Sequence, residues 1–228
     1  ADKVARGWAT TAVLALCTLA IVLPAAVTIG VVSGLRQGSW LDRGLNLGAV
    51  TLNAVPEFAF GLLLVGVFSL QAGWLPATGG GASGWSLLSE PAVLVLPVAV
   101  LAAKQVCGLA RQIRIGVAEA HGAAYVRHVR LLGMPERTVV FRHVLPNAVR
   151  PAVQQGARTV DGLLGGVVVV EALFALPGLG SDFVRSVQGR DLPAIQGYAL
   201  VFAATTVTVN LAADLLSRRI GPRQEVPT

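Results

Sequence analysis

Three long uncharged runs dominate the pattern of apolar and polar positions along the chain. No charged residue occurs from Gly7 to Leu35, from Phe58 to Ser89, or from Leu192 to Ala213. Each run exceeds the roughly 20 residues that a helix needs to cross the hydrocarbon core of a membrane. A secretory signal is shorter and occurs once, at the N-terminus, so it does not explain three runs. The pattern predicts an integral membrane protein.

Helices are the only elements that suit these runs. Open strands leave unsatisfied edges in lipid, and the residue alternation of a transmembrane barrel is absent. We therefore expect an all-α, polytopic helical bundle in which residues 1–228 form a single transmembrane domain. Five spans are predicted, at about residues 8–35, 44–75, 91–109, 151–173 and 195–216. Pro56-Glu57 interrupts the second of them.

The composition agrees, and the charge distribution gives an orientation. The chain is 54% hydrophobic and only 13% charged, too little charge to cover a soluble protein of 228 residues. Seven arginines but only two acids lie within residues 111–150, so this segment carries most of the net charge of +6. The positive-inside rule places residues 111–150 and the C-terminus in the cytoplasm. Aromatic residues are not interleaved with these arginines, which argues against a nucleic-acid surface.

The same rule suggests that a segment is missing upstream. Residues 76–90 contain no Lys or Arg and are expected outside. Counting back from there, Lys3 and Arg6 also fall outside, which opposes the positive-inside rule. The chain also begins with Ala. We expect a sixth span, upstream of the five, to be absent from this sequence.

Sequence motifs for catalysis, metal binding and nucleotide binding are absent. The three histidines are too scattered for a recognisable metal site, and no Ser or Thr follows either lysine as a phosphate-binding loop requires. The nucleophile motif G-x-S-x-G is also missing. We expect no enzyme activity and no cofactor in this chain.

The cytoplasmic segment predicts a helix-turn-helix. Gly133 can end one short helix and Pro135 can begin the next. Leu145 and Pro146 follow Gly133 by twelve and thirteen residues. A short rigid element across the ends of the spans can transmit the motion of a partner into the membrane.

This spacing resembles the permease-to-ATPase coupling motif of bacterial ABC importers. The motif's usual Glu-Ala-Ala start is replaced here by Arg127-His128-Val129. The opening Tyr125-Val126-Arg127 and the close Arg142-His143-Val144-Leu145-Pro146-Asn147 are similar to the dipeptide/oligopeptide/nickel permease family, B-type subunit. The resemblance extends over nearly the whole chain.

The resemblance implies a permease subunit in a heteromeric complex of the bacterial plasma (inner) membrane. The implied partners are a second permease subunit, two ATP-binding subunits that hold ATP and Mg, and an external solute-binding protein. The implied cargo is short peptides. Alternatives are a nickel or glutathione importer of the same family, or an ATP-independent secondary carrier. The residues expected to couple to the ATPases are Tyr125, Arg127, Arg130, Gly133, Arg137, Arg142, His143, Leu145 and Pro146.

Four ionisable residues inside the predicted spans are candidates for the translocation pathway, because charge within a membrane usually faces a bundle interior or a cavity. Glu57 lies near mid-membrane and either lines the pathway or pairs with Lys104 or Arg158. Arg158 and Asp161 are three residues apart and can pair on one helix face. Glu171, near the outer end of its span, either holds a closed gate or accepts hydrogen bonds from the following loop.

Overall fold

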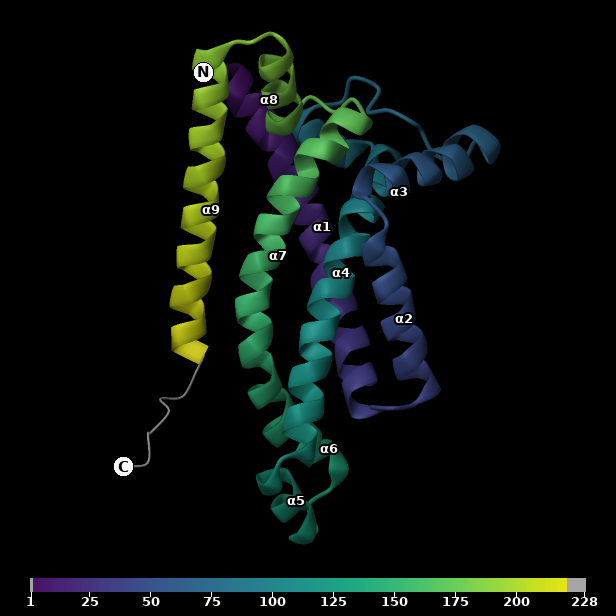
Figure 1. Cartoon of the computed structure of the whole chain (residues 1–228), viewed down its shortest axis with the longest axis vertical. Coiled ribbons are helices and arrows are strands. Elements are labelled where there is room, and N and C mark those ends of the chain that lie inside the picture. Colours follow the sequence, from purple (N-terminus) through teal and green to yellow (C-terminus); the bar gives the residue numbers. More distant parts are fainter. Residues whose placement is uncertain (1, 221–228) are drawn as a thin grey trace.

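The computed structural model describes the backbone of residues 2–220, and the side chains of these residues except 2–6, 149–155, 157, 158, 213 and 216–220. Within this part of the chain the structure is helical and contains no strand, as the sequence predicts. Four long helices follow the long axis (Figure 1). They are α1 (Asp2–Leu35), α4 (Pro91–Gly122), α7 (Leu145–Leu173) and α9 (Leu192–Ile220).

Among the described residues, the most extensive helix pairing is between α1 and α4, and small residues allow it. A methyl group added at Gly30 would lie 2.7 Å from Ile113 Cβ, and one at Gly34 would lie 2.7 Å from Val117 Cβ. Both distances are too short for real side chains. Glycine at these two positions lets the helices approach closely, as small residues do in membrane bundles. Buried apolar side chains of α1, α4 and α7 continue this core along the bundle.

The expected span at residues 44–75 is not one straight helix. It divides into α2 (Trp40–Ala54), α3 (Glu57–Leu64) and the π-helix η1 (Val65–Gln71), and the chain bends by 100° between α2 and the α3–η1 pair. Pro56 explains the break, because a proline forces the preceding residue out of the helical region. Val55 accordingly has φ −79° and ψ 127°.

Three helices of the described chain are long and apolar enough to cross a membrane, or four if the bent pair counts as one span. The three segments are Gly7–Leu35, Pro91–Gly122 and Leu192–Ala212. Helix α7 contains the expected span 151–173 but is not among them. Its sequence includes Arg158, Asp161 and Glu171, which makes it less apolar than the other three long helices.

The two ends of the bundle carry different short elements. At one end α5 (Ala124–Leu131), α6 (Glu136–Val139) and the π-helix η3 (Val140–Val144) connect α4 to α7. At the opposite end lies α8 (Leu179–Gln188), which follows α7 (Figure 1). The expected loop of residues 111–150 needs correction, since α4 continues as one helix to Gly122 and α7 begins at Leu145. Arg111 and Arg114 therefore lie on a long helix, because no helix-breaking residue ends α4 before Gly122.

Candidate coupling element and translocation residues

Residues 124–144, here called the coupling element, form the helix-turn-helix that the sequence predicts. Helix α5 ends at Leu131, and Gly133 follows with φ +78°, the left-handed conformation that glycine favours after a helix. Its N–H donates to the Arg130 carbonyl at 2.9 Å. Pro135 stands just before α6. A side chain added at Gly133 would meet no atom within 4 Å, so backbone conformation rather than space explains the glycine.

A small hydrogen-bond cluster joins the start of the coupling element to the start of α7. The Tyr125 hydroxyl donates to the His143 carbonyl at 3.2 Å. The Asn147 amide donates to the same carbonyl at 2.8 Å and to the Tyr125 hydroxyl at 3.1 Å. These bonds hold α5 against the residues that lead into α7, so a displacement of α5 would also displace the start of α7.

Arg130 joins three elements at the other side of the turn. Its guanidinium donates twice to the Glu136 carboxylate, with Nη2 to Oε1 at 2.7 Å and Nε to Oε2 at 3.1 Å. Nη2 also lies 3.0 Å from Nε2 of His121 on the last turn of α4. The Arg130 guanidinium holds the pKa of the Glu136 carboxyl below its usual value. Arg130 is thus already paired within the chain, whereas Arg127, Arg137 and Arg142 form no ion pair with any described side chain.

The outer surface of the coupling element is both basic and apolar. Arg127, Arg137 and Arg142 are exposed. Large apolar side chains are exposed beside them, namely Leu131, Leu132, Met134 and Phe141. Val126, Val139 and Val144 are fully buried and hold the element on the bundle. Leu145 is half-buried and Pro146 exposed where α7 begins.

Glu57 is the first residue of α3, and its carboxylate faces α7. A methyl group added at Gly166 would lie 3.0 Å from Glu57 Oε2, so the absence of a side chain there makes room for the carboxylate. Lys104 is exposed and forms no ion pair with Glu57 among the described side chains. The proposed alternative partner, the side chain of Arg158, lies outside the described residues.

Asp161 faces a different helix. Its carboxylate accepts both of its described hydrogen bonds from the Asn210 amide of α9, at 2.9 and 3.0 Å. The expected pairing with Arg158 again falls outside the described side chains. Asp161 therefore contributes a polar contact between α7 and α9.

Glu171 is fully buried and fastens α8 to the bundle. It accepts hydrogen bonds from the backbone N–H of Gly180 at 2.8 Å and of Ser181 at 3.1 Å, in the first turn of α8. The Thr11 hydroxyl of α1 donates to it at 2.6 Å and accepts from the Leu179 N–H at 3.1 Å. One carboxylate thus ties together α1, α7 and α8.

These translocation candidates do not converge on one site. Glu57 lies where α3 meets α7, and Asp161 lies where α7 meets α9. Glu171, on α7, contacts the start of α8. Three residues that the sequence did not single out make polar contacts between helices, namely Thr11, Asp42 and Arg114. No spacing rule could find them, because their partners are 72 or 160 residues away. Among the described residues no cluster of His, Cys, Asp and Glu could hold a metal ion.

The chain is similar to known membrane transport proteins over most of its length. Residues 26–226 match the family described as "Binding-protein-dependent transport system inner membrane component". The oligopeptide transport system permease protein AppB of Bacillus subtilis (strain 168) is 35% identical over 94% of this chain and 69% of its own length. The glutathione transport system permease protein GsiC of Escherichia coli (strain K12) is 34% identical over 97% of this chain and 70% of its own length.

A solved structure supports the fold. The crystal structure of an amino acid ABC transporter with histidines superposes with a TM-score of 0.63, covering 93% of this chain and 92% of that one. The two sequences are 21% identical, so this likeness concerns the fold alone.

Proposed function

Because the chain belongs to the family of binding-protein-dependent transport system inner membrane components, we propose that it is the permease subunit of an ATP-driven importer of short peptides. In this proposal it forms half of the translocation pathway, and a second permease forms the other half. Two separate ATPase subunits hold ATP and Mg, and an external solute-binding protein delivers the cargo. The chain itself needs no cofactor and catalyses no reaction.

The coupling element carries this proposal. It protrudes at one end of the bundle (Figure 1) and combines exposed apolar residues with exposed arginines. Such a surface suits a groove on another protein that is lined by apolar residues and rimmed by carboxylates, since arginine binds carboxylates with two parallel hydrogen bonds. It also stands between α4 and α7, so that a partner holding it would move both helices.

The orientation follows from the same assignment. We infer that the coupling element and the C-terminus face the cytoplasm, where ATP is available, and that α8 faces outward. The arginine content of residues 111–150 supports this orientation through the positive-inside rule.

The choice of peptides as cargo rests on the relatives. The name of AppB states that it transports oligopeptides. The name of GsiC states that it transports glutathione, which is itself a short peptide. Oligopeptides and glutathione are both small molecules with amide bonds, an amino terminus and a carboxylate. Glutathione import is therefore the second candidate for this chain.

The proposal is tested by purifying the tagged chain in mild detergent from its native membrane. We expect a second permease and ATPase subunits to co-purify, and the ATPase activity of the reconstituted complex to rise when peptide-loaded binding protein is added. If the chain alone transports peptides in liposomes without nucleotide, it is a secondary carrier and the proposal is wrong.

A further inference from the structure

A cavity with a volume of about 530 Å³ lies between α1, α2 and α4. Its walls are apolar over most of their area and include Ile29, Leu52, Ala102 and Val106. The volume lies in the range of ligand pockets, roughly 300–1,000 Å³. None of the translocation candidates or coupling residues lines it, so the functional assignment above leaves this cavity unexplained.

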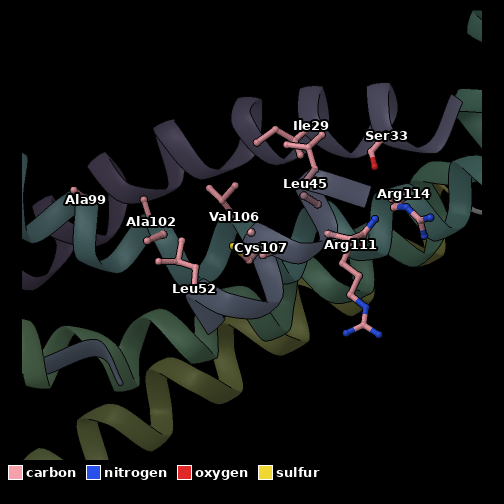
Figure 2. A pocket seen from close by; sticks show the side chains of 16 residues that line it. Ile29, Ser33, Leu45, Leu52, Ala99, Ala102, Val106, Cys107, Arg111 and Arg114 are labelled. Atoms are coloured by element: carbon pink, nitrogen blue, oxygen red, sulfur yellow. The ribbon is translucent and has the colours of Figure 1, made fainter. Parts of the chain in front are cut away.

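The two ends of the cavity differ in polarity. Figure 2 shows Arg111 and Arg114 with Ser33 at one end, whereas Ala99 lies at the other. Arg114 is bound to Asp42. Arg111 is exposed and forms no ion pair with any described side chain. The cavity therefore has one cationic end with a guanidinium still available to a ligand.

The length of the cavity matches one leaflet of a membrane. Ala99 and Arg111 are twelve residues apart on α4, which corresponds to about 18 Å of helix rise. Half of the hydrocarbon core is about 15 Å thick. An acyl chain whose headgroup lies at Arg111 would thus end near Ala99, close to the middle of the bilayer.

The width of the cavity suits a hydrocarbon chain. Spread over that length, the volume gives a mean cross-section of about 30 Å². A cross-section of this size accommodates an extended acyl chain.

We propose that this cavity binds an anionic phospholipid from the leaflet at the α5–α6 end, with an acyl chain between α1, α2 and α4 and the phosphate on Arg111. A guanidinium matches the geometry of a phosphate with two hydrogen bonds. Anionic headgroups also attract basic residues near the membrane surface. This site is independent of the transported substrate.

The test uses native membranes that contain the chain with its natural partners. Phosphatidylglycerol with a photoactivatable diazirine in its acyl chain is incorporated and irradiated, and adducts are mapped by mass spectrometry. Phosphatidylcholine with the same acyl chain is the neutral comparison. We expect adducts in residues 45–52 and 99–106, with a yield about fivefold higher for the anionic lipid, the effect expected of one arginine near the surface.

Two variants, each with a matched control, make the result specific. Arg111→Gln should lower the yield for phosphatidylglycerol to that for phosphatidylcholine, whereas Arg36→Gln, an exposed arginine outside the cavity, should not. Gly48→Phe should lower both yields, because Gly48 lines the cavity and an added side chain there meets no atom within 4 Å. Gly197→Phe on α9 makes the same change away from the cavity, also in open space, and should have no effect.

Equal expression and equal unfolding temperatures of the four variants are required for the comparison. Adducts that depend on Arg111 and are blocked by Gly48→Phe support the proposal. It is overturned if residues 45–52 and 99–106 form no lipid adduct, or crosslink to another protein chain instead. It is also overturned if the yields are unchanged in Arg111→Gln or in Gly48→Phe.

Discussion

Asp42 and Arg114 lie 72 residues apart and form a bidentate ion pair, with Arg114 Nη2 2.6 Å from Asp42 Oδ2. Ser33 and Asn46 also donate to this carboxylate, as does the Gly38 backbone N–H at 2.9 Å. Asp42 is only 2% exposed. The pair joins the start of α2 to the part of α4 that leads into the coupling element. The pair therefore fastens α2 to α4 near the coupling element.

The first prediction concerns this pair. Asp42→Asn leaves the Arg114 charge poorly compensated, and we expect it to lower the free energy of unfolding by about 3 kcal/mol, as for other buried pairs that lose one partner. Thermal unfolding in detergent measures the change. The matched control is Asp182→Asn, whose partner Arg185 is mostly exposed. It should cost about 0.5 kcal/mol or less. Equal effects of the two substitutions would contradict the structural role of Asp42.

The second prediction concerns the turn of the coupling element. Because Gly133 has φ +78° in open space, the size of a replacement matters less than its tolerance for the left-handed conformation. We expect Gly133→Asn to be mild, since Asn adopts this conformation more readily, and Gly133→Val to be severe. Hydrogen exchange of α5 and α6 measures the loosening of the turn, and co-purification of ATPase subunits measures its consequence.

Gly122 offers the control for this experiment. It is the last residue of α4, has no positive φ, and an added side chain would meet nothing within 4 Å. Gly122→Ala should leave both measurements unchanged or slightly improve helix stability. If Gly133→Val behaves like Gly122→Ala, the conformation of Gly133 does not matter for coupling.

The coupling element could be predicted from the sequence because its determinants are local. A glycine that ends one helix and a proline that starts the next act within a few residues of the chain. The same holds for the break at Pro56, although its size does not follow from the proline alone. The 100° bend depends on how α3 packs against α4 and α7, and packing of distant segments leaves no local signal.

The polar contacts between helices could not be predicted for the same reason. Glu171 stands out in the sequence as an ionisable residue inside a predicted span. Its partner Thr11, however, belongs to a helix whose sequence indicates only an apolar span. Asp42 lies between the first two expected spans, where a solvated carboxylate is the ordinary interpretation. Hydrogen bonds from the segment after α7 to Glu171 are one of the two expected roles of this residue. Only the structure, however, shows that both carboxylates are buried and that Thr11 and Arg114 are their partners.

The third prediction concerns the attachment of α8. Glu171→Leu removes both carboxylate oxygens at similar side-chain size, so the backbone donors at the start of α8 lose their acceptor. Leaving buried donors unsatisfied costs about 1–3 kcal/mol. We expect faster hydrogen exchange at the amides of Gly180 and Ser181, both of which donate to Glu171.

Thr11 provides the paired comparison for Glu171. Thr11→Val removes the hydroxyl and should also accelerate exchange at Leu179, whose N–H donates to it. Thr11→Ser keeps the hydroxyl and should resemble the original chain. Protection of α8 that is the same in all of these variants would show that the Glu171 cluster does not hold α8 in place.

The last prediction concerns Glu57, whose carboxylate lies against Gly166 without an ion pair among the described side chains. A carboxylate in this position can attract the amino terminus of a peptide, and such attraction is strong where water is scarce. We expect Glu57→Gln to reduce peptide uptake by about tenfold, equivalent to one lost charge interaction of about 1.4 kcal/mol, with little change in unfolding temperature. Glu90→Gln makes the same chemical change at an exposed carboxylate and should leave uptake unchanged. A lower unfolding temperature in Glu57→Gln would instead identify Glu57 as a structural partner between helices. Normal uptake together with normal stability would contradict both roles, since neither the pathway nor the packing would then depend on its charge.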